Sequence, residues 1–215
     1  MPGVFDRKRR RAIVRKISED YEDALSTYFG TKSPDSVAAK DQHRGYVDAL
    51  RSCGVEVEIL DALEGHPDCC FVEDTAIVFE DAVVICNPGH ASRAGEVNSI
   101  AERLSNDFKI QRMPPDAMMD GGDVIYTGSK ILIGLSTRTN AMGAEFLSKF
   151  AAERNISTQI IEVPKTTLHL TTVCSVPRDG TIIAAEGHLR PDQLESFDEV
   201  IWVPAEEAYA ANTIA

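Results

Sequence analysis

The sequence has no long hydrophobic run and no apolar leader. A helix that spans a bilayer needs about 20 consecutive, mainly apolar residues, and no stretch of this chain reaches that length. The N-terminal text MPGVFDRKRRRAIVRK is basic, but it is not followed by the apolar segment of about 7 to 15 residues that a secretory signal needs. We therefore expect no membrane partner and a cytoplasmic location.

Cysteine is scarce and has no paired spacing. The chain has 5 cysteines, an odd number, and no C-x-x-C motif. This pattern argues against a disulfide framework and against a zinc module. We expect free thiols in a reducing compartment and no metal site. The cysteines are Cys53, Cys69, Cys70, Cys86 and Cys174.

Positive charge is also in short supply. The chain has 22 Lys and Arg residues against 34 Asp and Glu residues, so its formal net charge is −12. A field of this sign repels phosphate backbones and attracts cationic ligands, so we expect no nucleic-acid partner. The basic cluster from Arg7 to Arg11 is short, and a solvated N-terminal arm explains it without a function.

The chain lacks low-complexity tracts and linkers rich in proline, glycine and serine. Its 215 residues, of which 43% are hydrophobic, are enough for one substantial core. We therefore expect a single domain over residues 1–215.

A repeat of about 49 residues is present instead. Asp74 and Asp123 are 49 positions apart (123 − 74 = 49), and each begins strand-like text, DTAIVFEDAVVICNPG and DVIYTGSKILIGLS. Glu96 and Glu145 have the same separation (145 − 96 = 49), inside the helix-like stretches GEVNSIAERLSN and GAEFLSKFAAERN. A third copy reads LHLTTVCSVPRDGTIIAAEGHL, followed by PDQLESFDEVIWVP. Chance agreement is the competing explanation, and three copies make it less attractive.

Each unit predicts strand, tight turn, strand, helix and strand. A first, partial unit has the strand AIVRKI, a helix from Ser33 to Ser52 and the strand VEVEIL. Repeats of this size indicate units that stack on their neighbours to bury their apolar faces. We expect an α/β propeller of about four units with an unclosed ring. The predicted hairpin turns are Glu80-Asp81, Gly128-Ser129 and Asp179-Gly180.

Three carboxylates lie beside one apolar strand. Asp68, Glu73 and Asp74 fall within PDCCFVEDTAIV, and a buried unpaired charge there would cost several kcal/mol. A planar guanidinium suits carboxylates arranged around its rim. These residues therefore indicate a site for a cationic ligand, with a solvated strand end as the alternative.

Two arginines occupy similar places in successive units. Arg93 follows a P-G-H-A-S loop and Arg138 follows an L-S-T loop, each just before a helix. Together they would clamp a carboxylate by bidentate bonds, which suits an amino acid that carries a guanidinium tail. Surface salt bridges are the competing account.

Two further segments complete the set. Asp120 opens the D-G-G-D sequence that ends at Asp123, where the glycines permit positive φ or close backbone approach, although a turn without function would use them equally well. His169 lies between two leucines, and a core histidine satisfied by a hydrogen bond is its alternative reading.

Taken together, these segments resemble the dimethylarginine dimethylaminohydrolase family of the amidinotransferase superfamily. PDCCFVEDTAIV is similar to the family's PDxxFVED segment, and MDGGDVIYTG, the RTN of GLSTRTNAMGAE and the LHL around His169 match in order and spacing. The resemblance covers essentially the whole chain, and its ending VPAEEAYAANTIA is similar to the family's stretch before the last strands.

The resemblance implies a five-bladed, pentein-like α/β propeller of ββαβ units that hydrolyses Nω-methylated arginines to citrulline and methylamine or dimethylamine. By this resemblance, Asp68, Glu73 and Asp74 hold the substrate guanidinium. His169 protonates the leaving amine and activates water. The remaining roles fall to Asp120 as acidic support, to Arg93 and Arg138 on the α-carboxylate, and to Leu25 in EDALSTYF as a lid contact.

The family's cysteine nucleophile lies some tens of residues beyond the position of Ala215, in strands that this chain is expected to lack. Cys174 is the cysteine nearest to His169, but five residues along a strand would place it about 16 Å away. We therefore expect the chain as given to be inactive. No cofactor is implied, and the expected partner is a small-molecule substrate, with a homodimer left open.

Two alternatives stay open. One is a related arginine deiminase or amidinotransferase, which the pocket around the substituted nitrogen would distinguish. The other is a non-catalytic binding protein on the same propeller, such as a ligand sensor or a ribosome anti-association factor.

Overall fold

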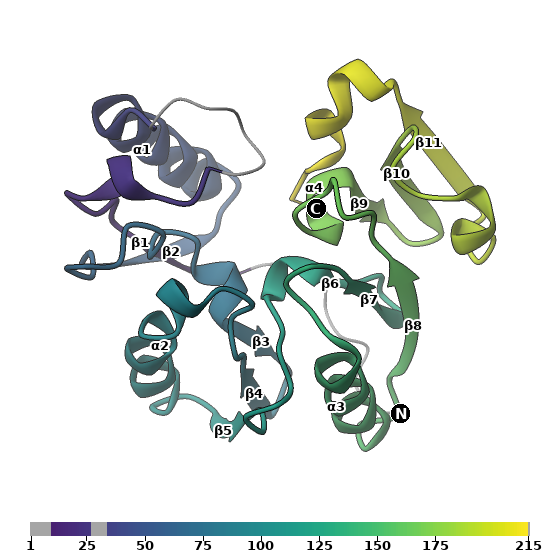
Figure 1. Ribbon diagram of the computed structural model, residues 1–215, viewed down its shortest axis with the longest axis horizontal. Coiled ribbons are helices and arrows are strands. Elements are labelled where there is room, and N and C mark those ends of the chain that lie inside the picture. Colours follow the sequence, from purple (N-terminus) through teal and green to yellow (C-terminus); the bar gives the residue numbers. More distant parts are fainter. Residues whose placement is uncertain (1–9, 27–33, 215) are drawn as a thin grey trace.

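The computed structural model of the protein describes residues 10–26 and 34–214. The chain has an α/β fold with four small sheets, which Figure 1 shows arranged in sequence order around a common centre. No helix in the described ranges has the length and apolar character needed to cross a membrane.

The first unit has two parallel strands joined by a helix. Strand β1 (Arg11–Arg15) pairs with β2 (Glu56–Leu60), and α1 (Ser36–Ser52) connects them. The carboxylate of Asp35 caps α1 by accepting from the backbone N–H groups of Val37 and Ala38, which fixes the helix start at Ser36. The predicted start, Ser33, lies outside the described residues.

The second and third units share the predicted strand, turn, strand, helix, strand order. In each, an antiparallel hairpin is followed by a helix and a parallel strand, so the ββαβ repeat is confirmed. The second unit comprises β3 (Ala76–Val78), β4 (Ala82–Ile85), α2 (Glu96–Leu104) and β5 (Lys109–Arg112). The third unit comprises β6 (Val124–Tyr126), β7 (Lys130–Leu135), α3 (Ala141–Ala152) and β8 (Ser157–Glu162).

The fourth unit keeps the strands and replaces the helix. Strands β9 (Cys174–Arg178) and β10 (Thr181–Ala185) form the hairpin, β11 (Glu199–Val203) pairs parallel with β10, and the short 3-10 helix η5 (Pro191–Leu194) stands between them. A further 3-10 helix, η6 (Ala205–Ala211), follows β11.

One strand prediction in this unit is wrong. The text from Leu168 was expected to be extended, but Leu170–Val173 forms the helical turn α4, and β9 begins only at Cys174. The reason is tertiary, because the backbone N–H of Leu170 donates to the buried carboxylate of Asp123. The spacing of about 16 Å between His169 and Cys174, which assumed a strand, therefore does not apply.

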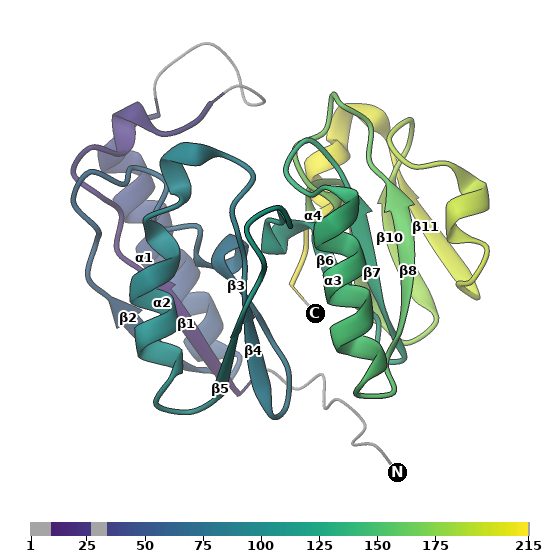
Figure 2. The same cartoon turned by 60° about the horizontal axis from the view of Figure 1, so that its bottom comes forward.

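The apolar cores lie between neighbouring units, as the repeat predicts. Figure 2 shows α2 lying along the sheet of β3, β4 and β5, and α3 lying along the sheet of β6, β7 and β8. Val83, Ile85 and Ile100 of the second unit pack with Ile13 and Leu60 of the first. Burying a side chain of this size stabilises the fold by about 1.5 to 3 kcal/mol, so stacking of units supplies much of the stability. The second and third units share a core that includes Phe79, Val84, Met119, Ile133 and Leu147, and the third and fourth share one that includes Leu132, Ile161, Leu170, Ile182 and Leu194.

Two of the three predicted hairpin turns contain glycine where the backbone requires it. Gly128 between β6 and β7 has φ of 101°, and Gly180 between β9 and β10 has φ of 74°. Residues with a Cβ rarely adopt this region. The turn chemistry read from the sequence therefore sets the register of both hairpins.

Candidate functional site

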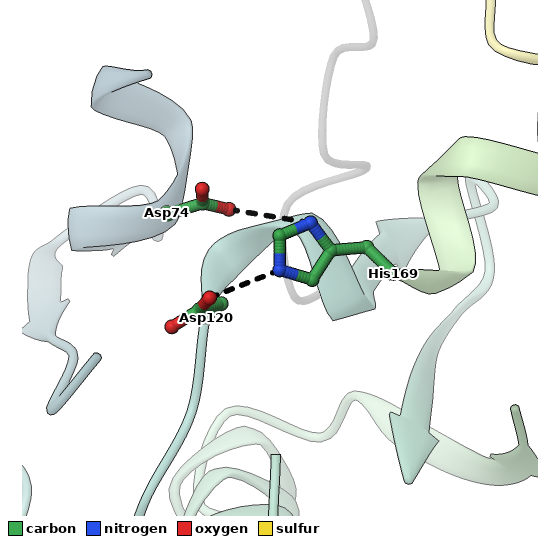
Figure 3. A group of neighbouring side chains, drawn as sticks. All are labelled: Asp74, Asp120 and His169. Atoms are coloured by element: carbon green, nitrogen blue, oxygen red, sulfur yellow. Dashed lines mark hydrogen bonds and ion pairs between the residues drawn. The ribbon is translucent and has the colours of Figure 1, made fainter. Parts of the chain in front are cut away.

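Three short helical turns occupy equivalent places in successive units. The 3-10 helix η2 (Val72–Thr75) precedes β3, η4 (Gly121–Asp123) precedes β6, and α4 precedes β9. The middle turn, η4, contacts both of the others. The group in Figure 3 comes from these places: Asp74 lies on η2, Asp120 directly precedes η4, and His169 directly precedes α4. The repeat that separates these residues in sequence is therefore what brings them together in space.

The imidazole of His169 lies between two buried carboxylates. Its Nε2 is 3.0 Å from Oδ2 of Asp120, and its Nδ1 is 3.9 Å from Oδ1 of Asp74 (Figure 3). Burial by itself disfavours the charged ring. The hydrogen bond with Asp120 and the charges of Asp74, Asp123 and Asp120 outweigh it, so the pKa of His169 is raised above its ordinary value. The geometry therefore favours a protonated, oriented imidazolium.

The two glycines of the D-G-G-D segment allow this close approach. A Cβ on Gly122 would lie 2.6 Å from Nδ1 of His169, and one on Gly121 would lie 2.0 Å from the carbonyl oxygen of Glu73. Neither glycine has a positive φ. Of the two reasons the sequence offered for these glycines, close backbone approach is the one the structure supports. The N–H of Gly122 also donates to Oδ1 of Asp74 (2.9 Å).

Asp120 joins His169 to the second predicted arginine. Its side chain is fully buried, Oδ1 accepts from the backbone N–H of Gly89 (2.7 Å), and Nη1 of Arg138 lies 3.8 Å from Oδ2. Arg138 is itself nearly buried, which argues against the surface salt bridge considered from the sequence. The structure thus places Arg138 next to the His169–Asp120 pair.

Arg93 is buried and fully engaged within the protein. Its guanidinium donates to both oxygens of Glu96 through Nε (3.1 Å each) and Nη2 (2.8 Å), to Oδ2 of Asp74 through Nη1, and to the carbonyl oxygen of Phe71 through Nη2 (2.9 Å). Burial lowers its pKa, but the two carboxylates more than compensate, and the net shift is upward. Without ligand, the guanidinium that Asp74 holds is therefore that of Arg93.

The remaining predicted residues flank this pair. Both carboxylate oxygens of Asp68 accept from the backbone N–H of Leu25, at 3.2 and 3.3 Å, and burial raises the pKa of Asp68. The carbonyl oxygen of Asp68 also accepts from Nη2 of Arg93 (3.4 Å). Glu73 lies on η2 next to Asp74, but its side chain is exposed. Contacts link most of the predicted site residues into one connected group, which comprises Leu25, Asp68, Asp74, Arg93, Asp120, Arg138 and His169.

Sequence reasoning missed two buried carboxylates. Asp123 is fully buried on η4, and burial raises its pKa to about 6 although Ser136, Thr139 and the charge of His169 oppose the shift. Glu96 is the buried partner of Arg93 on α2. In the sequence, Glu96 marks only the 49-residue repeat, and Asp123 marks that repeat and the end of the D-G-G-D segment. Their recurrence at fixed offsets was the signal that could have identified them.

The cysteines near this group are not activated. Cys86 is fully buried, and burial together with the charges of Asp120 and Asp74 raises the pKa of its thiol well above the ordinary value. Burial raises the pKa of Cys70 to about 12, and Asp68 contributes to the shift. Both side chains are therefore thiols at neutral pH, whereas a nucleophile needs the thiolate.

The same three side chains could also hold a metal ion. One ligand atom each from Asp74, Asp120 and His169 lies within 4.8 Å of the other two. However, Asp74 is already paired with Arg93, and Asp120 with His169 and Gly89. The sequence prediction that the site needs no metal stays a prediction.

The chain matches a family model described as N,N dimethylarginine dimethylhydrolase, eukaryotic, over residues 19–196. It is 31% identical over 208 residues to the N(G),N(G)-dimethylarginine dimethylaminohydrolase of Pseudomonas aeruginosa, covering 95% of this chain and 80% of the relative. The structure of a cysteine-to-serine mutant of the Pseudomonas aeruginosa protein complexed with citrulline superposes with a TM-score of 0.87 at 31% identity, covering 94% of this chain and 79% of the other.

The fold is also similar to that of a more distantly related protein. The N-terminal domain of ArgZ, an arginine dihydrolase from cyanobacteria, superposes with a TM-score of 0.83 at 18% identity, covering 94% of this chain and 79% of that one. At this identity the likeness shows a shared fold alone.

Proposed function

The chain belongs to the dimethylarginine dimethylaminohydrolase family, whose members are hydrolases, and we propose that its site takes Nω-methylated arginines, which the family converts to citrulline and methylamine or dimethylamine. The observation that carries this proposal is the imidazole of His169 held between the carboxylates of Asp120 and Asp74. The substrate is a cation, and a chain with net charge −12 attracts it.

In the proposed reaction, a thiolate attacks the guanidinium carbon and the carbon–nitrogen bond to the methylated nitrogen breaks. His169, whose raised pKa favours the protonated ring, donates its proton to the departing amine. The neutral imidazole then takes a proton from water, which attacks the carbon and releases citrulline and the thiolate. Asp120 orients the ring and stabilises its charged form.

Ligand binding follows from the charges around the ring. Asp74 would hold the guanidinium rim, with Asp68 and Glu73 close in sequence, and Arg138 would hold the α-carboxylate. For Arg93 to share that carboxylate, it would have to exchange part of its pairing with Asp74 or Glu96. The guanidinium of the incoming substrate could replace that of Arg93 on Asp74. Substrate binding and the release of Arg93 from Asp74 would then occur in one step. The Leu25 segment, tied to Asp68, would border the ligand.

The thiolate is not supplied by the cysteines near the ring. The pKa values of Cys86 and Cys70 are raised, and Cys174 is buried in the core of the fourth unit with a raised pKa. We therefore propose that these 215 residues bind substrate and position the proton donor but do not turn over by themselves. Loss of a nucleophile leaves only the binding and electrostatic terms.

We propose that residues 1–215 form one catalytic domain with the architecture of a pentein-like α/β propeller, of which the four sheets are blades. Support comes from the ββαβ repeat, from the cores shared between neighbouring units and from the arrangement around a centre in Figure 1. The cytoplasmic location and the homodimer stay predictions.

Calorimetry with asymmetric dimethylarginine, monomethylarginine, arginine and lysine tests the proposal, with a citrulline assay on the same samples. We expect the methylated arginines to bind, lysine not to bind, and no citrulline to form. Arg138→Ala should weaken binding of the methylarginines, whereas Arg178→Ala, on an exposed arginine of β9, should not.

Three outcomes would change the proposal. No binding at millimolar ligand would overturn it and favour a protein-binding propeller. Tighter binding of arginine than of methylarginine would favour the deiminase alternative. Citrulline release at an enzymatic rate would show that another residue of this chain makes the attack.

A further inference from the structure

Asp123 is a buried carboxylate with three donors and no assigned role. It lies on η4 and is fully shielded from solvent. Its Oδ1 accepts from the backbone N–H of Leu170 (2.9 Å), and its Oδ2 accepts from Oγ of Ser136 (2.6 Å) and from Oγ1 of Thr139 (2.7 Å). A buried charge persists only where such donors compensate it, so this arrangement is specific to a carboxylate.

The donor on Oδ1 belongs to the segment that carries the proposed proton donor. Leu170 follows His169 directly, and His169 is the residue that caps the turn α4. Fixing the N–H of Leu170 fixes the backbone from which the imidazole extends. Without this bond, α4 would begin with an unpaired buried N–H group.

The donors on Oδ2 belong to the loop that carries the second arginine. Ser136 and Thr139 flank Arg138, and the backbone N–H of Arg138 donates to Oγ of Ser136 (2.9 Å). Oγ1 of Thr139 accepts in turn from the backbone N–H of Asp120 (3.3 Å). One carboxylate thus ties together the loop after β7, the residue before η4 and the start of α4.

We propose that Asp123 is a positioning residue that holds the His169 segment and the Arg138 loop in one fixed arrangement, so that the proton donor and the carboxylate-binding arginine face the same ligand. The roles of His169 and Arg138 rest on the proposed function. The link between the two segments, which consists of the hydrogen bonds to Asp123 and its charge, does not depend on the proposed function.

The charge of Asp123 adds to the link. The charged and titratable groups that face the imidazole are Asp74 on η2, Asp120 before η4 and Asp123 within η4, with Arg138 on the far side of Asp120. Each carboxylate favours the protonated ring. Removing the charge of Asp123 while keeping its shape should therefore lower the pKa of His169, which a role in packing alone would not do.

The test compares Asp123→Asn with Asp81→Asn, an exposed aspartate that pairs with Arg154. Nuclear magnetic resonance of the chain with labelled histidine and arginine follows the titration of His169 and the backbone amide of Arg138. In Asp123→Asn we expect the pKa of His169 to fall and the Arg138 amide signal to move. Asp81→Asn should change neither. Unchanged titration of His169 in folded Asp123→Asn would overturn the proposal.

Ser136→Ala provides the answer if Asp123→Asn fails to fold. This variant keeps the charge and removes one donor from Oδ2. The hydroxyl of Ser136 donates to Asp123 and accepts from the backbone N–H of Arg138, so its removal perturbs the link at the carboxylate and at the arginine loop together. We expect a smaller fall than in Asp123→Asn, and no change in Ser105→Ala, whose hydroxyl bonds only within its own helix end. An unchanged His169 in Ser136→Ala would then overturn the link.

Ligand binding separates this proposal from the proposed function. Dimethylarginine and its decarboxylated counterpart, dimethylagmatine, differ only in the group that Arg138 would hold. Asp123→Asn should weaken dimethylarginine more than dimethylagmatine. If the unmodified chain binds neither ligand, the proposed function fails, and the titration of His169 still decides the role of Asp123.

Discussion

Gly122 leaves no room for a side chain beside His169. A Cβ at this position would lie 2.6 Å from Nδ1 and 2.8 Å from Cγ of the ring, and 2.9 Å from Oδ1 of Asp74. Real Cβ atoms do not approach other atoms so closely. The close approach of the imidazole and Asp74 thus depends on the absence of a side chain at Gly122.

Gly122→Ala should therefore displace the imidazole. We expect loss of methylarginine binding and a loss of about 1 to 3 kcal/mol in the free energy of unfolding, the usual cost of overpacking a dense interior. Calorimetry and urea denaturation measure the two effects. Gly45→Ala is the matched control, because Gly45 is exposed in α1 and a Cβ there meets nothing within 4 Å. That change should stabilise the helix by about 0.5 to 1 kcal/mol. Normal binding by Gly122→Ala would contradict the assigned geometry.

Glu96→Gln should destabilise the protein. The change leaves the buried guanidinium of Arg93 with Asp74 as its one charged partner, and breaking a buried pair costs about 3 to 5 kcal/mol. The repeat supplies the control, since Glu145 follows Glu96 by 49 residues and also lies on a helix, α3, but is exposed beside Lys149. Glu145→Gln should change the free energy of unfolding by less than about 0.5 kcal/mol. Equal effects of the two substitutions in urea denaturation would show that Glu96 does not hold Arg93.

The buried carboxyl of Asp123 should make stability fall as the pH rises. Its pKa is about 6 in the folded chain against an ordinary value of 3.8, so between these values the folded state keeps a proton that the unfolded state has released. Between about pH 4 and pH 6 this group therefore removes about 3 kcal/mol from the free energy of unfolding. The raised pKa of His169 acts in the same direction, because its contribution is lost as the pH rises through the folded value.

Asp123→Asn removes the first of these contributions. Measured by urea denaturation from pH 4 to pH 7, the difference in unfolding free energy between the variant and the unmodified protein should move in favour of the variant by up to about 3 kcal/mol. A difference independent of pH would mean that Asp123 titrates normally and that its burial is already compensated.

Thiol reactivity should follow burial. Cys53 is exposed at the end of α1, whereas Cys86 and Cys174 are buried with raised pKa values. Alkylation at pH 7.5 followed by peptide mass spectrometry should label Cys53 first, and Cys86 and Cys174 only under unfolding conditions. Rapid labelling of Cys86, blocked by methylarginine, would instead identify an activated thiol beside Asp120 and would revise the expectation of no turnover.

The repeat was accessible from sequence because it rests on local patterns. Apolar alternation and turn residues such as Gly128 and Gly180 predict hairpins, and the 49-residue offset predicts that their ends fall at equivalent places. The same reasoning gathered Asp74, Asp120 and His169 at one site. This reasoning could not predict the helical turn at Leu170, because a carboxylate from another unit, that of Asp123, determines the turn.

The partners of the arginines were also beyond the sequence. Arg93 and Arg138 look alike in their local text, yet Arg93 is enclosed by Glu96 and Asp74 while Arg138 approaches Asp120 at 3.8 Å. Only the packing of α2 against η2 distinguishes them. A pattern can therefore locate charged residues at a site without showing which charges face each other before ligand arrives.

Asp74, Asp120 and His169 lie in or directly before the three helical turns that precede β3, β6 and β9. No single repeat contains a fragment of this site that could work alone, and its geometry exists only once three consecutive repeats have docked. Amide hydrogen exchange at Gly122 and Leu170 should accordingly share one opening event, and a substitution that loosens any of the three junctions should be detected first as a change in the environment of the imidazole.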